Sequence, residues 1–295
     1  MVPSGSALEY TRHEKLLYRW IGRDIENALP AKANGELPSI KSAKLTNQQR
    51  EKYLSRLEDG LNPERGLRAR VPEEQLGFEK RSWKPSLPTL SFTELSLASS
   101  QKHCRLYGRL GFAFTKQSLL AMPGRPVAYI PGGASDPTLV RLLRLQANIQ
   151  SKCGKSIEAD FEYLLHYYKR LRFQLIRQKA PKYPTQKSDE KSPVPKKSRI
   201  EVNPYFPETR PLPYLEEQEW RVVIQDPSRF TTAPGKDGAA AVWFPIVPKY
   251  ELLMVVVPDN IMLSQIFNCP TLREHLCPVK GRPVQVISHE AIHRL

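Results

Sequence analysis

The chain has 295 residues, a length that allows one large domain or two ordinary ones. Its 45 Lys and Arg residues outnumber the 30 Asp and Glu residues and give a formal net charge of +15, which attracts anionic partners without choosing among them. The longest aliphatic run, 252–257, is too short to cross a bilayer. The first residues lack the apolar stretch of a secretory signal, so we expect a cytoplasmic protein.

The four cysteines are too few and too scattered for a disulfide framework. Cys269, His275 and Cys277 combine thiolate and imidazole, which are zinc ligands, but their spacing matches no zinc knuckle and a fourth ligand is missing. We therefore predict no metal site. His103 and Cys104 are adjacent, and on a strand they would point to opposite faces, which argues against a catalytic Cys-His pair.

The first third of the chain predicts short strands and one helix. Residues 16–25 indicate a strand that runs into a glycine turn. Thr46 and Gln49 have the spacing of a capping box, so we expect a helix to begin there and to stop at Gly60. Another short strand is expected at about 89–92, and the segment after it is suited to a helical turn that begins near Ser91 or Thr93.

The stretch QKHCRLYGRLGFAFTKQS at 101–118 mixes glycine, aromatic and cationic side chains. A phosphate-binding loop would need a third glycine and a following helix, and Phe112 and Phe114 continue instead with strand-like alternation. We interpret the stretch as a strand in which a glycine lets another backbone or a ring approach closely. One face of this strand would carry a row of side chains suited to an anion: His103, Arg105, Tyr107 and Arg109.

Residues 126–130 predict a strand, and two helices follow between 137 and 178 as a protruding hairpin. Asp136 and Pro137 form a cap and a first-turn proline for the first helix. The second helix has an apolar stripe that needs an apolar partner surface. Its other face is basic, and we predict that it binds an anionic partner through four residues: Lys169, Arg170, Arg172 and Arg177.

The chain is rich in proline and lysine from 181 to 213 and poor in large aliphatic residues, so we expect an exposed connection there. Three β-branched runs after it predict strands at 220–225, 250–258 and 283–288. Together the elements predict an α+β fold with a mostly antiparallel central sheet, packed helices and a protruding helical hairpin.

We expect a single α+β domain assembled from two separated parts of the chain. Its N-terminal part is 1–135, and strands in 214–295 complete it. The helical hairpin at 136–180 and the connection at 181–213 are insertions between these parts.

The stretch LEEQEWR at 215–221 is a second dense polar site. On a strand, the period of two places Glu217, Glu219 and Arg221 on one face. Carboxylates beside a guanidinium can hold a ribose hydroxyl, stabilise a cationic transition state, or form only a structural ion-pair cluster. Arg221 is equally suited to binding and to anchoring the strand, and the residues alone leave these roles open.

Blocks spread over most of the chain resemble the AbiGi family, antitoxins of bacterial abortive phage-infection systems. FTELSL, YGRLGFAF and GRPVAY are similar to the family's FTEL, YGRLGIGF and G.PV.Y, and RWIGRDI and EWR to its HWTGKDI and EWR. In this sequence the blocks lie at 19–25, 54–61, 92–97, 102–103, 107–114, 124–129 and 217–221. The chain departs from the family at Arg19, where the family has histidine, and at Ile21, where it has threonine.

The resemblance implies an antitoxin-like anti-phage protein that is paired with a toxin encoded nearby. In this interpretation the protein is a binding module, whose basic face and apolar helices contact the toxin or nucleic acid. It would have no catalytic requirement and no cofactor.

The alternative is an ADP-ribosyltransferase-like enzyme that uses NAD, or a degenerate relative of one. Arg19, Ser91-x-Thr93 and Glu217-x-Glu219 look like the Arg, Ser-Thr-Ser and Glu-x-Glu series of that superfamily. The chemistry needs an arginine for the dinucleotide phosphates, a hydroxyl for the nicotinamide ribose and a carboxylate for the oxocarbenium-like centre. These motifs are short and common, so the binding module ranks first unless the side chains converge on one cleft.

Overall fold

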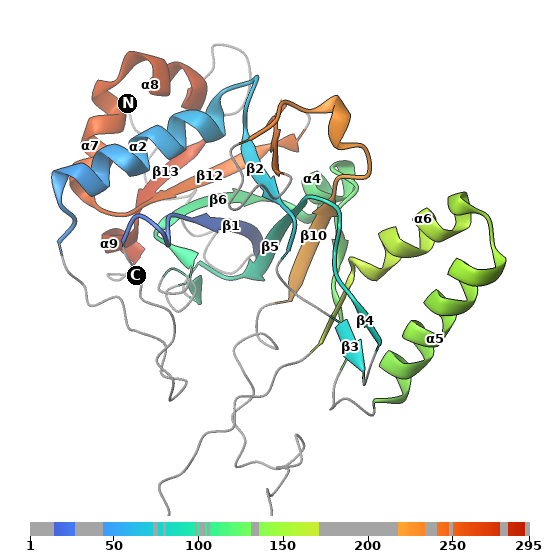
Figure 1. The fold of residues 1–295 in the computed structure, drawn as a ribbon. Helices are drawn as coiled ribbons and strands as arrows, with labels where there is room; N and C mark the ends of the chain where they lie inside the picture. Colours follow the sequence, from blue (N-terminus) through green and yellow to red (C-terminus); the bar gives the residue numbers. More distant parts are fainter. Residues whose placement is uncertain are drawn as a thin grey trace, which may run out of the picture.

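The computed structural model describes residues 15–26, 44–72, 76–78, 81–97, 99–100, 104, 107–130, 136–170, 218–233, 241–247, 250–277 and 283–292. Within these residues the chain has an α+β fold (Figure 1). A nine-stranded, mostly antiparallel sheet carries helices on both faces, and a helical hairpin projects from one side.

Nine segments form the main sheet: β1 (Leu16–Ile21), β2 (Leu67–Arg70), β5 (Thr89–Leu95), β6 (Leu110–Phe114), β7 (Arg125–Pro126), β10 (Glu219–Val223), β11 (Ala241–Phe244), β12 (Leu252–Val257) and β13 (Gln285–Ser288). Their order is β11-β2-β5-β1-β6-β12-β13, and β10 pairs with both β5 and β7. Only the pairing of β12 with β13 is parallel among these described strands. The strands expected near 16, 89, 110, 222, 254 and 285 are confirmed. The single strand expected at 126–130 is wrong, because Val127 separates two short strands, Arg125–Pro126 in the main sheet and Ala128–Ile130 in another.

Helices cover the sheet on both sides: α2 (Asn47–Leu61), α4 (Lys116–Ala121), α7 (Asn260–Asn268), α8 (Pro270–Leu276) and α9 (His289–Ile292), with a short 3-10 turn, η2, at Pro227–Arg229. Figure 1 shows α2, α7 and α8 on one face and α9 on the other. The first face buries residues such as Tyr53, Leu57 and Ile266, and the second buries Trp20 and Met254. No described helix has the length and apolar character needed to cross a bilayer.

The capping box predicted for α2 is present, since Thr46 Oγ1 accepts from Gln49 N and Gln49 Oε1 accepts from Thr46 N. The predicted stop at Gly60 is wrong, because α2 continues to Leu61. Gly60 instead faces the ring of Phe112, which lies 2.5 Å from where a Cβ would be. The glycine therefore serves close packing of the helix on β6.

The stretch 101–118 contains a strand, but it starts later than expected. Gly108 N donates to Cys104 O, an i to i−4 bond, so Tyr107 belongs to a helical turn that ends before β6. Gly108 has φ +105°, and a Cβ there would lie 2.3 Å from Ile21 O. The expected close backbone approach is confirmed, whereas the strand face shared by Tyr107 and Arg109 is wrong; His103 and Arg105 lie outside the described residues.

Two other predictions about β5 and the hairpin need correction. β5 runs unbroken to Leu95, so no helical turn begins at Ser91 or Thr93; pairing with β1 and β10 holds this segment extended. The second hairpin helix ends at Leu165 rather than near 178. Residues 168–170 form a strand instead, and 171–178 lie outside the described residues.

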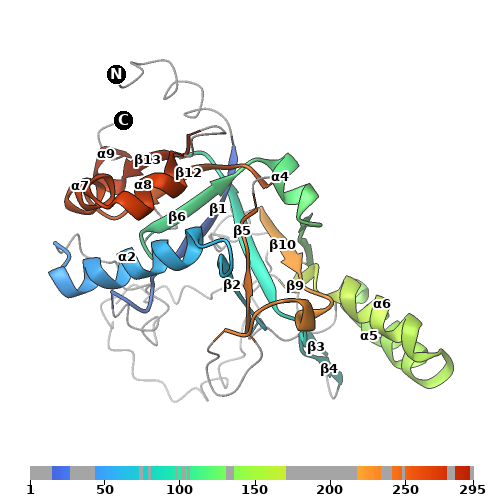
Figure 2. The same ribbon diagram turned by 90° about the horizontal axis from the view of Figure 1, so that it is seen from above.

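The hairpin consists of α5 (Pro137–Lys152) and α6 (Lys155–Leu165), and it stands away from the sheet (Figure 2). Asp136 Oδ1 accepts from Thr138 N and Leu139 N, which confirms the predicted cap. Four short strands lie at its base: β3 (Leu76–Phe78), β4 (Arg81–Trp83), β8 (Ala128–Ile130) and β9 (Tyr168–Arg170). Here Trp83, Leu139 and Leu165 form part of a small separate core.

His166 fixes the end of α6 to the rest of the fold. Its Nε2 accepts from Leu87 N at 3.1 Å, so its Nδ1 carries the proton and donates to Glu162 O at 2.8 Å. Burial lowers the pKa of His166, and the nearby Arg221 charge also lowers it. The imidazole is therefore neutral in the folded protein at physiological pH.

We predict that the stability of the protein falls as the pH drops below the pKa of an exposed histidine. The unfolded chain then binds a proton that folded His166 resists, so the stabilisation present above that pH is lost as the pH falls through the lowered pKa. Urea unfolding at pH 7.5 and 5.5 measures the loss. His166→Gln should be less stable at pH 7.5 but should show a smaller pH dependence, and an unchanged pH dependence would contradict the assignment.

Candidate functional site

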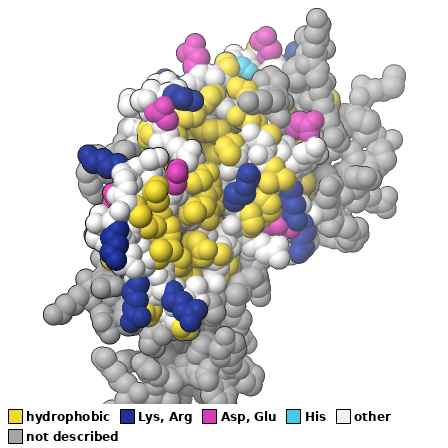
Figure 3. All heavy atoms as spheres, turned by 90° about the vertical axis from the view of Figure 1, so that its right-hand side faces the viewer, with side chains coloured by type: hydrophobic (Ala, Val, Ile, Leu, Met, Phe, Trp, Pro, Cys, Tyr) yellow, Lys and Arg dark blue, Asp and Glu magenta, His cyan; other side chains and the backbone are white. Residues whose placement is uncertain are grey.

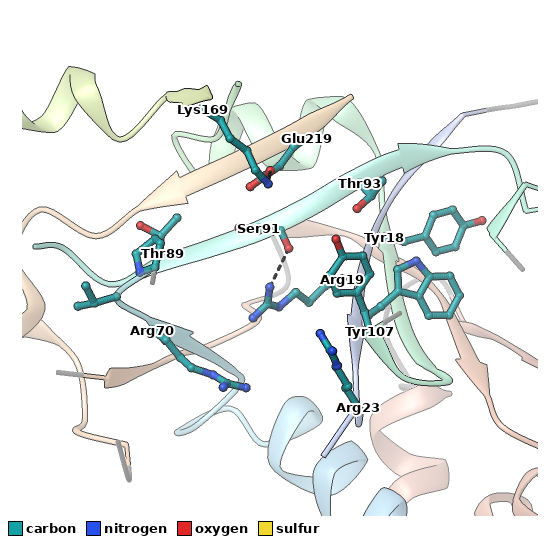
Figure 4. Close-up of a pocket in the computed structure, with 13 residues that line it drawn as sticks. Tyr18, Arg19, Arg23, Arg70, Thr89, Ser91, Thr93, Tyr107, Lys169 and Glu219 are labelled. Carbon is teal, nitrogen blue, oxygen red and sulfur yellow. Dashed lines mark hydrogen bonds and ion pairs between the residues drawn. The ribbon is translucent and has the colours of Figure 1, made fainter. Parts of the chain in front are cut away.

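A cleft of about 460 Å³ opens where β1 and β5 separate (Figure 4). The two strands pair as far as Tyr18 and Thr93. Beyond this point β1 continues along β6 to Ile21, and β5 continues along β10 to Thr89. The diverging backbones leave a space between them, and side chains from β1, β2, β5, β9 and β10 line it.

Arg19 crosses the gap between the two strands. Its Nη1 donates to Ser91 O at 2.9 Å, and its Nη2 makes a longer 3.5 Å contact with Arg68 O. Its Nε is closed off from solvent and has no partner among the described residues. Burial lowers the pKa of Arg19 to about 10, a shift to which Arg70 adds and which Glu219 opposes. Arg19 is thus a charged group without a contacting carboxylate in the described structure, which suits it to an anionic ligand.

Glu219 lies opposite Thr93 on β10 and is buried. Its Oε1 accepts from Arg221 Nε at 2.8 Å, and its Oε2 accepts from Lys169 Nζ at 2.6 Å. Burial acts to raise the pKa of Glu219, but Arg221 and Lys169 outweigh it and hold the pKa below its usual value. The cleft therefore contains an ionised carboxylate at neutral pH.

Arg221 anchors its strand rather than facing the cleft. Its side chain is 1% exposed, and its Nη1 donates to His166 O at 2.6 Å in addition to the bond with Glu219. Arg109 has a similar structural role, because it forms two 2.8 Å bonds with the carboxylate of Glu26. Of the two roles left open for Arg221, the contacts favour anchoring.

Ser91 and Thr93 supply hydroxyls to the cleft, and neither hydroxyl has a hydrogen-bond partner within the described residues. Both sit on β5 between Arg19 and Glu219 (Figure 4). Tyr107 also lines the cleft beside Arg19. Hydroxyls, a guanidinium and a carboxylate thus surround one space, an arrangement that fits a ligand carrying both phosphate and sugar.

Predicted site residues from distant parts of the sequence meet at this cleft: Arg19, Ser91, Thr93, Tyr107, Lys169 and Glu219. Glu217, Arg172 and Arg177 lie outside the described residues, and Arg170 ends β9. Lys169 does not belong to a basic helix face, since it is on β9 and reaches Glu219. Sequence reasoning missed Arg23 and Arg70; the alternation of LRAR at 67–70 was the signal that could have identified Arg70.

The described residues contain no group of three or more His, Cys, Asp and Glu side chains placed to hold a metal ion. Cys104 is fully buried, and burial raises the pKa of its thiol. A thiolate nucleophile at this position is therefore disfavoured.

No protein-family model matches the chain, and neither a curated protein nor a solved structure is significantly similar to it.

We predict that Arg221→Met lowers the free energy of unfolding by about 3–5 kcal/mol, because it leaves Glu219 buried with one partner removed. Lys169→Met should cost less, since Lys169 is 16% exposed and water can replace it. Urea denaturation measures both. The double variant Arg221→Met with Glu219→Gln should recover part of the loss, and equal costs for the two single variants would contradict this account.

Proposed function

We propose that the cleft binds NAD and that the protein is an ADP-ribosyltransferase-like enzyme that serves bacterial anti-phage defence. The observation that carries the proposal is the meeting of Arg19, Ser91, Thr93 and Glu219 around one cleft. These residues come from three strands that are far apart in the sequence, so chance spacing of short motifs does not account for their meeting. The geometry thus favours the transferase alternative over the pure binding module.

Arg19 is the group that supports pyrophosphate binding. A guanidinium can donate two parallel hydrogen bonds to phosphate oxygens, and these bonds are strong where water is excluded. Its partners in the described structure are backbone carbonyls, which hold it in place without neutralising its charge. A ligand pyrophosphate would supply the missing anion.

Glu219 and the two hydroxyls support binding of the nicotinamide ribose. An ionised carboxylate next to the ribose stabilises positive charge that develops at C1′ when the bond to nicotinamide breaks. The low pKa of Glu219 keeps the carboxylate ionised at neutral pH. Lys169 occupies one carboxylate oxygen and is the more exposed of its two partners, so it is the one that must move aside for a ribose hydroxyl.

The reaction would break the bond between ribose C1′ and the nicotinamide nitrogen, and nicotinamide would leave with the bonding electron pair. An acceptor hydroxyl, or water, would form the new bond to C1′ and release a proton. The electrons and atoms balance without a further oxidant or a metal.

The defence role rests on the resemblance to the AbiGi family over blocks that follow the same order. Several of these blocks have residues that line the cleft: Arg19, Trp20 and Arg23 from 19–25, Thr93 from 92–97, and Glu219 from the EWR block. The resemblance supports membership of an anti-phage system, and the transferase activity rests on the residues of the cleft.

We predict that the purified protein binds NAD and releases nicotinamide from it. Arg19→Gln should weaken NAD binding at least tenfold, through loss of a charge-assisted contact. Glu219→Gln should bind NAD but release nicotinamide about 100-fold more slowly or worse, because the charge opposite C1′ is gone. Calorimetry and chromatographic assay of nicotinamide measure the two steps.

Arg144→Gln is the matched control, since it removes an exposed charge on α5 and should change neither step. Folded protein that binds no NAD would reject the proposal. Binding without any release of nicotinamide would identify a degenerate relative of the transferases.

Exposed apolar side chains on the hairpin support the binding-module function independently of the cleft. Figure 3 shows the side of the molecule that carries the hairpin, where hydrophobic side chains gather on the surface with Lys and Arg around them. Leu145, Ile157 and Leu164 are each about half exposed, at 48%, 53% and 54%. The apolar stripe expected on the second helix is thus left partly uncovered, which is typical of a protein-binding surface.

We predict that this surface binds the protein encoded by a neighbouring gene. If that protein arrests growth, co-expression of the chain should relieve the arrest, and Ile157→Glu with Leu164→Glu should abolish the relief by placing charges in an apolar contact. Glu219→Gln should leave the relief intact, because Glu219 is in the cleft. Loss of relief in Glu219→Gln alone, with nicotinamide released by the wild type, would assign the effect to the enzyme instead.

A further inference from the structure

Arg23 and Arg70 line the same cleft, and their side chains have no ion-pair or hydrogen-bond partner among the described residues. Both side chains are exposed. Arg70 is the last residue of β2, and Arg23 follows the glycine turn after β1. Figure 4 shows both lying on the side of Arg19 away from Glu219. The proposed function assigns no role to the positive charges of these two side chains.

The position of Arg23 is built into the fold. Its backbone N donates to Tyr107 O at 3.1 Å. The turn that carries it continues to Glu26, which Arg109 holds in two hydrogen bonds and Tyr53 in a third. The backbone that carries Arg23 is thus held in place beside the cleft.

β5 sets the order of the charged groups along the cleft. Arg70 pairs with Thr89, Arg19 bonds to Ser91 O, and Glu219 pairs with Thr93. Alternate residues of a strand are separated by about 7 Å, so the three β5 positions that these residues contact follow one another at roughly that interval. The order is Glu219, then Arg19, then Arg70.

A nicotinamide dinucleotide has one ribose on each side of its pyrophosphate. With the reacting ribose at Glu219 and the pyrophosphate at Arg19, the adenosine ribose extends toward Arg70. In other dinucleotide sites a carboxylate accepts the hydroxyls of this ribose when the ligand is NAD, and an arginine accommodates the 2′-phosphate when it is NADP. Among the described residues that line the cleft, the only carboxylate is Glu219, at the other end.

The charges of the lining residues also favour a ligand that carries a 2′-phosphate. Arg19, Arg23, Arg70 and Lys169 are cationic, and Glu219 is the one anion among the described lining residues. The pyrophosphate contributes two negative charges, and a 2′-phosphate adds up to two more. Burial lowers the pKa of Arg19, and the charge of Arg70 lowers it further. An anion bound near both guanidinium groups would offset this repulsion.

We propose that the cleft prefers NADP to NAD and that Arg70 and Arg23 hold the 2′-phosphate. This preference rests on the proposed function, because it assumes that a nicotinamide dinucleotide lies along the cleft in the stated direction. It adds a ligand selectivity that the Arg, Ser and Glu series does not contain.

Calorimetric titration of the full chain with NAD and NADP tests the preference. The wild type should bind NADP at least tenfold more tightly, which corresponds to about one charge-assisted contact. Arg70→Gln should reduce NADP affinity about tenfold while leaving NAD affinity within about twofold, and Arg23→Gln should act in the same direction. Arg144→Gln should alter neither affinity, and circular dichroism confirms that each variant is folded.

Titration with ADP-ribose and with its 2′-phosphate repeats the comparison without the nicotinamide charge. The 2′-phosphate form should bind about tenfold more tightly than ADP-ribose. Equal or weaker binding of NADP in the wild type overturns the preference and leaves the proposed function standing. An equal loss of affinity for NAD and NADP in Arg70→Gln also overturns the preference, because this result would place Arg70 at the pyrophosphate or give it a role in folding. Failure of both dinucleotides to bind overturns the proposed function itself.

Discussion

The buried guanidinium of Arg221 links the central sheet to the base of the hairpin. One nitrogen bonds to the carboxylate of Glu219 and another to the carbonyl of His166, at the end of the hairpin. A charged group this deeply buried is stable only with such partners. Sheet, hairpin and cleft carboxylate are consequently held in one arrangement, and the position of Glu219 depends on it.

The cleft itself depends on the divergence of two neighbouring strands. β1 and β5 stop pairing after Tyr18 and Thr93, because each continues along a different neighbour. Arg19 fills part of the opening and bonds to the backbone of β5, so it links the two strands across the cleft and leaves the rest of the cleft open. A rigid sheet thus presents an unneutralised cation and an ionised carboxylate to one space, which is the preorganisation that binding and catalysis need.

Local sequence signals predicted most of the strands, the capping box of α2 and the cap of α5. These features depend on alternation, on hydroxyl and carboxylate caps and on β-branched runs, all of which act over a few residues. The predictions failed where tertiary contacts decide the outcome. Gly60 lies inside the helix and packs on Phe112, and residues 168–170 form a strand beside β8 instead of continuing the helix.

The sequence by itself determined which chemical groups are available: Arg19, the hydroxyls of β5, and Glu219 beside Arg221, in an order that suggested a transferase-like series. Only the tertiary structure decided that these groups meet, that Lys169 joins them from β9, and that Arg70 extends the row. The reason is physical. Spacing along the chain determines which face of an element a side chain occupies, whereas strand pairing between distant segments determines which faces share a cleft.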